Sequence, residues 1–359
     1  MTELSDLPLR ESLKGREPYG APQLHVPVAL NVNENTHRIP ETVALDIVQS
    51  VAAAVLEINR YPDREFLELR WALADYLGHK LDASQIWAAN GSNEVIQQIF
   101  QAFGGPGRKA LGYAPTYSMY SLIAQGTDTA YVGAPRADRY ELDVETAVAA
   151  IHEHKPDIVL LCSPNNPTGT PLSLDVIKAV YAATSGIVVV DEAYAEFAHD
   201  ADSTALSLLP GRERLMVSRT MSKAFAFAGA RVGYLAADAA VIDALRLVRL
   251  PYHLSAFTQA AATAALRHAP LMLEAVADIR VQRDRIVNEL QKLGLDAFRS
   301  DANFVLFGGL ADPEDTWQQL LDRGVLVRNV GIPGTLRVSA GTASETDQFL
   351  TALKEVLHG

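Results

Sequence analysis

The sequence contains almost no cysteine and no long apolar run. Cys162 is the only cysteine among 359 residues, so the chain can form neither an internal disulfide nor a zinc site built from cysteines. No stretch approaches the roughly 18 to 20 apolar residues that cross a membrane. Residues 1–6 lack the basic start and apolar segment of a secretion signal. We therefore expect a cytoplasmic protein without a membrane partner.

Positive charge is also scarce. The chain has 31 Lys and Arg against 43 Asp and Glu, which gives a net charge of −12 and disfavours nucleic acid as a partner. An anionic small molecule remains possible, because a few arginines can dominate a cleft locally. His152 and His154 are two residues apart and point in different directions on a helix. We therefore expect no metal site.

Short apolar runs alternate with segments of helical spacing through the first two thirds of the chain. The runs cover residues 86–89, 110–113, 157–162, 186–190 and 215–218. Such short and wholly apolar runs are typical of buried parallel strands, and helices between them indicate α/β layering. The pattern predicts a mostly parallel central sheet flanked by helices.

The length and the change of pattern along the chain predict two domains and an arm. Residues 1–40 are rich in Pro and Asn and form the expected N-terminal arm, which we expect to pack with the small domain. Residues 41–255 form the large α/β domain, and residues 256–359 a smaller α+β domain. The smaller domain is predicted to begin with a long helical region and to continue with short strands, at residues 258–293, 303–307, 326–328 and 336–339.

Lys223 is the strongest candidate for a reactive side chain. It directly follows Ser222, Thr220 stands three residues before it, and Arg231 stands eight residues after it. A lysine amine can form a Schiff base with an aldehyde, and hydroxyl groups with an arginine can bind a phosphate. Pyridoxal 5′-phosphate carries both groups. The segment therefore predicts a site for this cofactor.

Further candidates stand where strands are predicted to end, which is where parallel sheets bind ligands. Asp191 can pair with a protonated pyridine nitrogen and so make the ring accept electrons. Tyr194 lies one turn further if a helix begins at Glu192, and Asn166 lies in a Pro-bounded loop; either can bind the phenolic oxygen of the ring. Taken singly, these residues also fit a capping acid, a buried tyrosine and an ordinary Asn-Pro turn.

Two more segments suit the same cofactor. Ser92 and Asn93 follow Gly91 at the start of a predicted helix, where free N–H groups and the helix dipole can seat a phosphate. A plain helix cap explains them equally well in isolation. Tyr117 lies in the next strand-end loop, where its ring can stack on a pyridine. The order of all these pieces along the chain is more specific than any one of them.

This order of motifs resembles the fold-type I, aspartate aminotransferase-like enzymes that depend on pyridoxal phosphate. Closer similarity is to the histidinol-phosphate aminotransferase family, and seven segments carry it. They are Asn-Val-Asn-Glu-Asn at 31–35, Asn-Arg-Tyr-Pro at 59–62, Ser-Lys-Ala-Phe at 222–225, and the segments 114–120, 250–255, 300–305 and 336–338. The Asn-Glu-Asn-Pro run of the family ends in Thr36 here. The resemblance implies fold type I with an N-terminal arm and a smaller C-terminal α+β domain.

The resemblance also implies a reaction. The family transfers an amino group between L-histidinol phosphate and 2-oxoglutarate, giving imidazole-acetol phosphate and glutamate in histidine biosynthesis. The implied kinetics are ping-pong, through the aldimine of Lys223, with Asp191 and Tyr194 as its catalytic partners. The family implies a homodimer in which the hydroxyl of Tyr61 reaches the cofactor phosphate of the neighbouring subunit.

Substrate contacts are implied as well. Arg337 is expected to hold the carboxylate of glutamate or 2-oxoglutarate, and Arg328 the substrate phosphate. Asn166, Tyr252 and Tyr19 are further expected substrate contacts. Three alternatives remain at this point: an aromatic amino-acid aminotransferase, a decarboxylase or lyase on the same scaffold, and the ligand-sensing domain of a transcription regulator.

Overall fold

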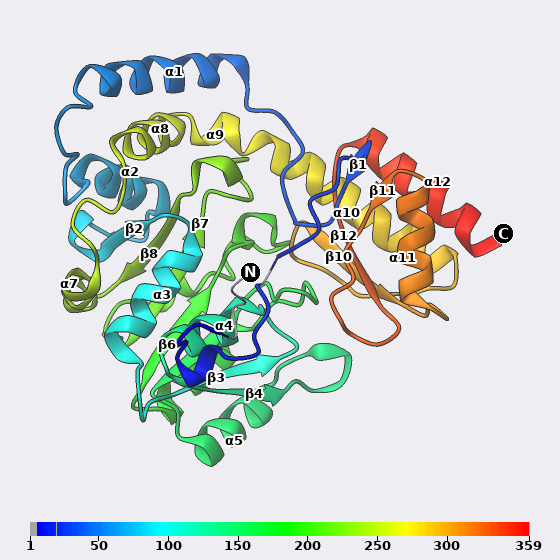
Figure 1. Cartoon of the computed structure of the whole chain (residues 1–359), viewed down its shortest axis with the longest axis horizontal. Helices are drawn as coiled ribbons and strands as arrows, with labels where there is room; N and C mark the ends of the chain where they lie inside the picture. Colours follow the sequence, from blue (N-terminus) through cyan, green and yellow to red (C-terminus); the bar gives the residue numbers. More distant parts are fainter. Residues whose placement is uncertain (1–5, 19, 359) are drawn as a thin grey trace.

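The main structural feature is a seven-stranded sheet with strand order β2-β8-β7-β6-β5-β3-β4 (Figure 1). The computed structural model describes residues 6–18 and 20–358 of the chain. Neighbours from β7 to β4 pair in parallel, whereas β8 is antiparallel to both β7 and β2. The strands are β2 (Ile86–Ala89), β3 (Lys109–Ala114), β4 (Ala130–Pro135), β5 (Ile158–Cys162), β6 (Ile187–Asp191), β7 (Leu215–Thr220) and β8 (Gly233–Ala237). The predicted mostly parallel sheet is confirmed.

Two strands of this sheet, β4 and β8, were not expected from the sequence. They read Ala-Tyr-Val-Gly-Ala-Pro and Gly-Tyr-Leu-Ala-Ala, and alanine, glycine and proline have low strand propensity. Tertiary pairing overrides that weak local signal. β8 is buried throughout between β2 and β7, and β4 pairs with β3 at the edge of the sheet.

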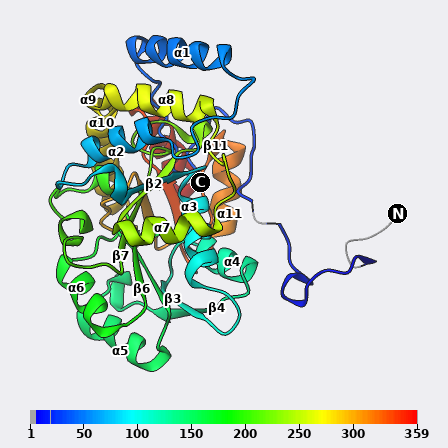
Figure 2. The same ribbon diagram turned by 90° about the vertical axis from the view of Figure 1, so that its left-hand side faces the viewer.

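Helices cover both faces of the sheet. Figure 2 shows α3 and α4 on one side and α6 on the other, with α1 and α8 packed above. The wholly buried strands β2, β5 and β8 are sandwiched between these layers, as their apolar composition requires. The helices of this unit are α1 (Glu41–Leu56), α2 (Leu67–Leu77), α3 (Ser92–Phe103), α4 (Met119–Gly126), α5 (Val144–His154), α6 (Leu174–Ala183) and α7 (Ala239–Val248).

The helical region predicted over residues 258–293 is confirmed, and it consists of three helices. They are α8 (Ala256–Arg267), α9 (Ala269–Met272) and α10 (Glu274–Lys292). Pro270 at the start of α9 cannot donate a backbone hydrogen bond to the preceding turn, so α8 ends before it. Figure 1 shows α10 running from the large unit into the smaller one.

The smaller unit contains a three-stranded antiparallel sheet with order β12-β10-β9, flanked by α10, α11 and α12. Its elements are β9 (Asp296–Ala297), β10 (Phe304–Gly308), α11 (Pro313–Asp322), β12 (Leu336–Ser339) and α12 (Ala343–His358). In the N-terminal arm, β1 (Val28–Ala29) pairs in parallel with β11 (Val325–Leu326). The strand expected at 326–328 is therefore shorter, and Arg328 forms only a single bridge with Arg337.

Short 3₁₀ helices complete the fold: η2 (Glu11–Leu13), η3 (Ala83–Gln85), η4 (Asp138–Tyr140), η5 (Ala195–Phe197), η6 (Ala205–Leu208) and η7 (Ala228–Ala230). The condition that a helix begins at Glu192 is not met, because the chain after Asp191 turns and η5 begins only at Ala195. Within the described ranges, no helix is long and apolar enough to cross a membrane. Nor do three metal-binding side chains gather anywhere in them.

Candidate active site

A cavity of about 410 Å³ opens beyond the carboxyl ends of the central strands. Cys162, Asp191 and Thr220, the last residues of β5, β6 and β7, all line it. Parallel sheets place ligands at this edge. Most of the predicted site residues line the same cavity: Ser92, Asn93, Tyr117, Asn166, Asp191, Tyr194, Thr220, Ser222, Lys223, Arg231, Arg328 and Arg337.

Lys223 follows β7 by three residues and points its amine into this cavity. Its Nζ donates to the carbonyl oxygen of Val32, in the N-terminal arm, at 3.0 Å. Loss of water around the amine, together with the positive charge of Arg337, lowers the pKa of Lys223 to about 8. A substantial fraction of the amine is therefore neutral near physiological pH. A neutral amine can attack an aldehyde or accept a proton.

Asp191 is 2% exposed, and its two oxygens have different surroundings. Oδ2 accepts a hydrogen bond from the hydroxyl of Tyr120 at 2.7 Å. Oδ1 is buried without a hydrogen-bond partner among the described residues. Burial raises the pKa of Asp191 to about 6, although the hydrogen bond from Tyr120 opposes that change. A buried carboxylate oxygen without a partner suits a cationic N–H donor.

Tyr194 is held by two amides from distant parts of the chain. Its hydroxyl oxygen accepts from Nδ2 of Asn33 at 3.0 Å and from Nδ2 of Asn166 at 3.3 Å. The ring packs edge-on against Phe304, with centroids 5.1 Å apart. Although no helix begins at Glu192, the turn after β6 still brings Tyr194 and Asn166 together.

The start of α3 and the end of β7 form a seat for an anion. Ser92 and Asn93 are the first residues of α3, whose first N–H groups have no partner within the helix. Across the cavity, the Thr220 hydroxyl lies 3.0 Å from that of Ser222, which in turn accepts from Arg231 at 3.4 Å. N–H groups, hydroxyls and a guanidinium together can bind a phosphate dianion.

Gly91 makes room for that seat. Its φ of +86° is a conformation that other residues adopt only under strain. A Cβ at this position would collide with the guanidinium of Arg231. The glycine therefore lets the arginine approach the first turn of α3.

Tyr117 lies beside this seat. Its hydroxyl donates to Oδ1 of Asn93 at 3.1 Å, and its ring is edge-on to Tyr120 with centroids 5.5 Å apart. The predicted ring-stacking residue is thus tied to the predicted phosphate seat. It also contacts the residue that holds Asp191.

The two predicted substrate arginines reach the cavity from the smaller unit. Arg337 donates to Oδ1 of Asn166 at 2.6 Å and to the carbonyl of Asn31 at 2.9 Å, and it lies over the ring of Phe304. The Arg328 side chain makes no hydrogen bond or ion pair with any described residue. Among the described residues, the cavity walls hold four cationic side chains against one carboxylate, that of Asp191, so the cavity favours anions.

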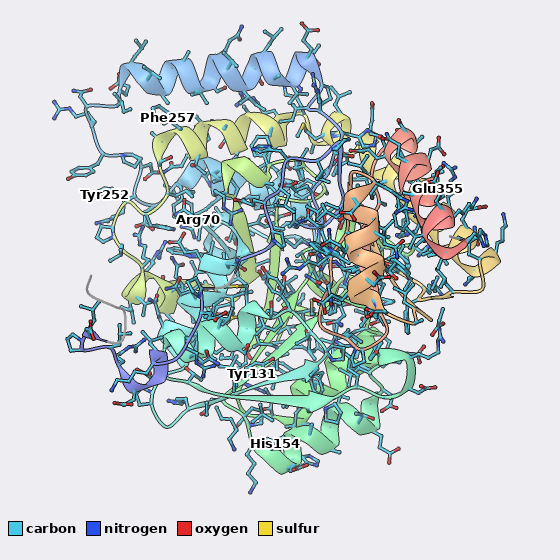
Figure 3. The ribbon with its side chains drawn as sticks, turned by 45° about the vertical axis from the view of Figure 1, so that its right-hand side comes forward. Arg70, Tyr131, His154, Tyr252, Phe257 and Glu355 are labelled. Carbon is cyan, nitrogen blue, oxygen red and sulfur yellow. The ribbon has the colours of Figure 1, made fainter. Side chains whose placement is uncertain are left out.

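Two predicted residues, Tyr61 and Tyr252, lie elsewhere. Tyr61 is 79% exposed and stacks on Tyr252, with ring centroids 4.4 Å apart. Neither residue lines the cavity of its own chain, and Figure 3 shows Tyr252 at the periphery, on the segment between α7 and α8. Tyr19 lies outside the described residues.

Sequence reasoning missed two residues that support the site directly. Tyr120 is wholly buried in α4 and holds Asp191, and Asn33 holds Tyr194. Both stand in segments that carry the family resemblance, 114–120 and 31–35. The family resemblance points to both segments, but no feature of the sequence indicates the roles of these side chains.

Comparisons with known proteins agree with this geometry. The family described as "Aminotransferase class I and II" matches residues 26–353. A histidinol-phosphate aminotransferase of Paenarthrobacter aurescens (strain TC1) is 64% identical over 100% of this chain and 97% of its own length. One of Thermobifida fusca (strain YX) is 56% identical over 98% of this chain and 95% of its own.

Solved structures show the same fold. The histidinol-phosphate aminotransferase of Sinorhizobium meliloti, in complex with pyridoxal-5′-phosphate, superposes with a TM-score of 0.83 at 27% identity. The match covers 93% of this chain and 91% of that one. The predicted fold class is confirmed. The chain therefore belongs to the class I and II aminotransferases, in the family of the histidinol-phosphate aminotransferases.

Proposed function

We propose that this chain transfers an amino group from L-histidinol phosphate to 2-oxoglutarate, with pyridoxal 5′-phosphate as cofactor. One observation carries the proposal. A lysine amine of lowered pKa, a buried carboxylate and an anion seat share one cavity at the carboxyl edge of a parallel sheet. The names of close relatives supply histidinol phosphate, and the family resemblance implies 2-oxoglutarate as the amino acceptor.

The residues of the cavity fit this cofactor on three counts. Asp191 has a buried oxygen without a hydrogen-bond partner in the described chain, which suits a protonated ring nitrogen. Gly91 leaves space that a Cβ would close, so Arg231 reaches the helix start and together they suit a phosphate. Lys223 supplies the amine for the aldehyde.

Bound pyridoxal phosphate supplies an aldehyde and an electron-accepting ring. The side chains around it have separate tasks. Asp191 holds the positive charge of the ring nitrogen. Tyr194 and Asn166 bind the phenolic oxygen. Lys223, once its amine is free and neutral, would take the proton from the α-carbon of the substrate and return it to the cofactor carbon that carried the aldehyde, because the amine remains within reach of both carbons.

The substrate arginines act at different anions. Arg337 is 7% exposed and already oriented by Asn166 and Asn31, so its planar fork is prepared to bind a carboxylate. Arg328 pairs with Arg337 in an isolated antiparallel bridge and also lines the cavity. Its guanidinium suits the phosphate of histidinol phosphate. One cavity can thus accept two substrates that carry different anionic groups.

A homodimer is part of this proposal. Many exposed apolar side chains belong to α1, α2 and α7 and to the segments that follow α1 and α7; these helices lie at the top and left of Figure 1. They are Leu45, Val48, Val55, Leu56, Ile58, Tyr61, Trp71, Leu247, Leu250 and Tyr252. Scattered single apolar residues are normal on a protein surface, but this many on neighbouring elements indicate an interface. A second copy of the chain would bury them. Tyr61 on this face then becomes the residue that reaches the neighbouring cofactor phosphate.

The dimer and the cellular location have simple tests. Sedimentation equilibrium should give twice the mass of one chain, and a Leu56→Glu substitution should shift the distribution toward the monomer. A single-chain mass for the unsubstituted protein contradicts the dimer. The cytoplasmic location stays a prediction, which fractionation of expressing cells would test.

The chemistry is tested by reduction and by turnover. Borohydride treatment of the holoenzyme followed by peptide mapping should place the reduced adduct on Lys223. Incubation with L-histidinol phosphate and 2-oxoglutarate should form glutamate, and Lys223→Ala should abolish multiple turnover. Phenylalanine serves as the comparison substrate. An adduct on another lysine, or faster turnover of phenylalanine, contradicts the proposal.

A further inference from the structure

A buried ion pair lies directly behind the cavity, where β6 and β7 end. Asp191 and Thr220 line the cavity, and the adjacent residues Glu192 and Arg219 do not. Side chains alternate across an extended chain, so one residue at each strand end faces the cavity and its neighbour faces away. The parallel pairing of β6 and β7 ends with Asp191 opposite Ser218. Glu192 and Arg219 are the next residues along the two chains.

The ion pair is tightly enclosed. Arg219 Nη2 and Nε donate to one oxygen of Glu192, Oε2, at 2.8 Å and 3.0 Å. Only 11% of the Arg219 side chain and 3% of the Glu192 side chain are exposed. Glu192 Oε1 accepts from the backbone N–H of Ala205 at 2.6 Å, and Thr204 donates to Oε2 at 2.8 Å. The hydrogen bonds of this carboxylate thus come from Arg219 and from two adjacent residues, Thr204 and Ala205.

A second carboxylate extends the network towards the lysine. Arg219 Nη1 lies 3.6 Å from Oε1 of Glu196, which also accepts from the hydroxyl of Tyr76 at 3.2 Å. The ring of Tyr76 is edge-on to Phe225, with centroids 5.2 Å apart. Phe225 follows Lys223 by two residues, so the network contacts the turn that carries the reactive amine.

We infer that Glu192 and Arg219 are positioning residues for the transamination. Their ion pair sets the distance between the end of β6, which carries Asp191, and the end of β7, which leads to Lys223. The inference rests on the proposed function, because both groups must meet one cofactor. Stability alone does not require such a pair, since apolar replacements of buried ion pairs are often as stable. Two directional hydrogen bonds from one rigid guanidinium do, however, define the distance between the two strand ends more narrowly than apolar packing does.

Two single substitutions test the geometry in the holoenzyme. Arg219→Lys keeps the charge and loses the fork, and Glu192→Gln keeps the shape and loses the charge. We expect kcat to fall by about 10- to 100-fold at nearly constant KM, as a displacement of about 1 Å between reacting groups allows. The visible circular dichroism of the bound cofactor should change, since it reports how the chromophore sits in the site. The dissociation constant for pyridoxal phosphate should rise.

The double variant Glu192→Gln/Arg219→Met separates positioning from charge burial. It removes both charges of the pair. Glu196, which loses Arg219, keeps the hydrogen bond from Tyr76, and burial raises the pKa of its carboxyl, so it can become neutral. The double variant should therefore fold even where a single variant does not. It should nevertheless keep the low kcat and the altered dichroism. Recovery of wild-type kcat and dichroism in the double variant overturns the inference.

Arg214→Lys is the matched control. Arg214 lies just before β7, where it ties the opposite end of the same two strands by donating to the carbonyls of Thr184 and Gly186 at 2.9 Å and 2.6 Å. Its replacement should lower the melting temperature and leave the dichroism, kcat and cofactor affinity unchanged. If the Arg219 and Glu192 variants behave like this control, the pair is only structural. An unsubstituted enzyme that does not bind the cofactor at Lys223 instead refutes the proposed function, and this inference with it.

Discussion

Removal of one hydroxyl, in Tyr120→Phe, should change the pH range in which the protein binds its cofactor. Tyr120 donates to Asp191 Oδ2 at 2.7 Å and is completely buried. That hydrogen bond favours the charged carboxylate, while burial disfavours it and raises the pKa of Asp191 to about 6. Without the hydroxyl, no hydrogen bond from residue 120 counteracts the effect of burial, so the pKa of Asp191 should rise further.

The size of the effect follows from the strength of such a bond. A hydrogen bond to a charged group contributes about 1.5 to 3 kcal/mol, and about 1.36 kcal/mol corresponds to one pH unit, so the pKa of Asp191 should rise by about 1 to 2. Asp191 is a group of raised pKa, so its charged form is present above the folded-state pKa and is lost as the pH falls through it. If pyridoxal phosphate binds the charged form, the variant should bind it about 5- to 50-fold more weakly at pH 6 and with nearly equal affinity above pH 9.

The assay is the dissociation constant of pyridoxal phosphate for both apoenzymes, measured by fluorescence from about pH 5 to about pH 10. The cofactor's own phosphate and the amine of Lys223, whose pKa is lowered to about 8, titrate in this range as well. Both are common to the two proteins, so they cancel in the ratio of dissociation constants. The ratio therefore isolates Asp191.

Tyr113→Phe provides the control. Tyr113 is also a buried tyrosine, and its hydroxyl donates to the backbone carbonyl of Ala147 at 2.8 Å rather than to an ionisable group. Removal of this hydroxyl also removes one buried hydrogen bond. It should nevertheless leave the ratio of the dissociation constants of the variant and the unsubstituted protein near one at every pH. A ratio for Tyr120→Phe that does not vary with pH would refute the role given to Asp191.

Three further substitutions test the anion sites. Gly91→Ala should weaken cofactor binding and lower the melting temperature, since the positive φ alone costs about 1 to 3 kcal/mol and the methyl group collides with Arg231; fluorescence titration and a melt measure both. Arg337→Lys should raise KM for glutamate and 2-oxoglutarate by about 10- to 100-fold, the equivalent of one charged hydrogen bond, with a smaller effect on L-histidinol phosphate. Arg328→Gln should show the reverse preference in the same steady-state assay. Equal effects of both arginine variants on all substrates would contradict their separate tasks.

The parts of the site that follow strands could be predicted from the sequence. Asp191 and Lys223 stand just after apolar runs, and Ser92 opens a helix after another. Parallel strands end at one edge of a sheet, so side chains that follow them converge without any knowledge of the long-range contacts. Local pattern and topology therefore locate these residues together.

The supporting residues could not be predicted in this way. Asn33 reaches Tyr194 across 161 residues of sequence, and Asn303 donates to the carbonyl of Asn33 across 270. These contacts depend on how the arm passes between the two units, which no local periodicity encodes. Tyr120 is a helical residue whose partner is decided by how α4 packs over the sheet.

Alternation of side chains at the strand ends gives the site both its reactive groups and their support. Asp191 and Thr220 line the cavity, whereas their neighbours Glu192 and Arg219 lie behind it. The cavity side gathers cations, whereas two carboxylates share one arginine behind it. Since surface charges more than about 8 Å away are screened at physiological salt, this local arrangement rather than the net charge of −12 governs the affinity for anions. An acidic protein can therefore bind a phosphorylated cofactor and two anionic substrates.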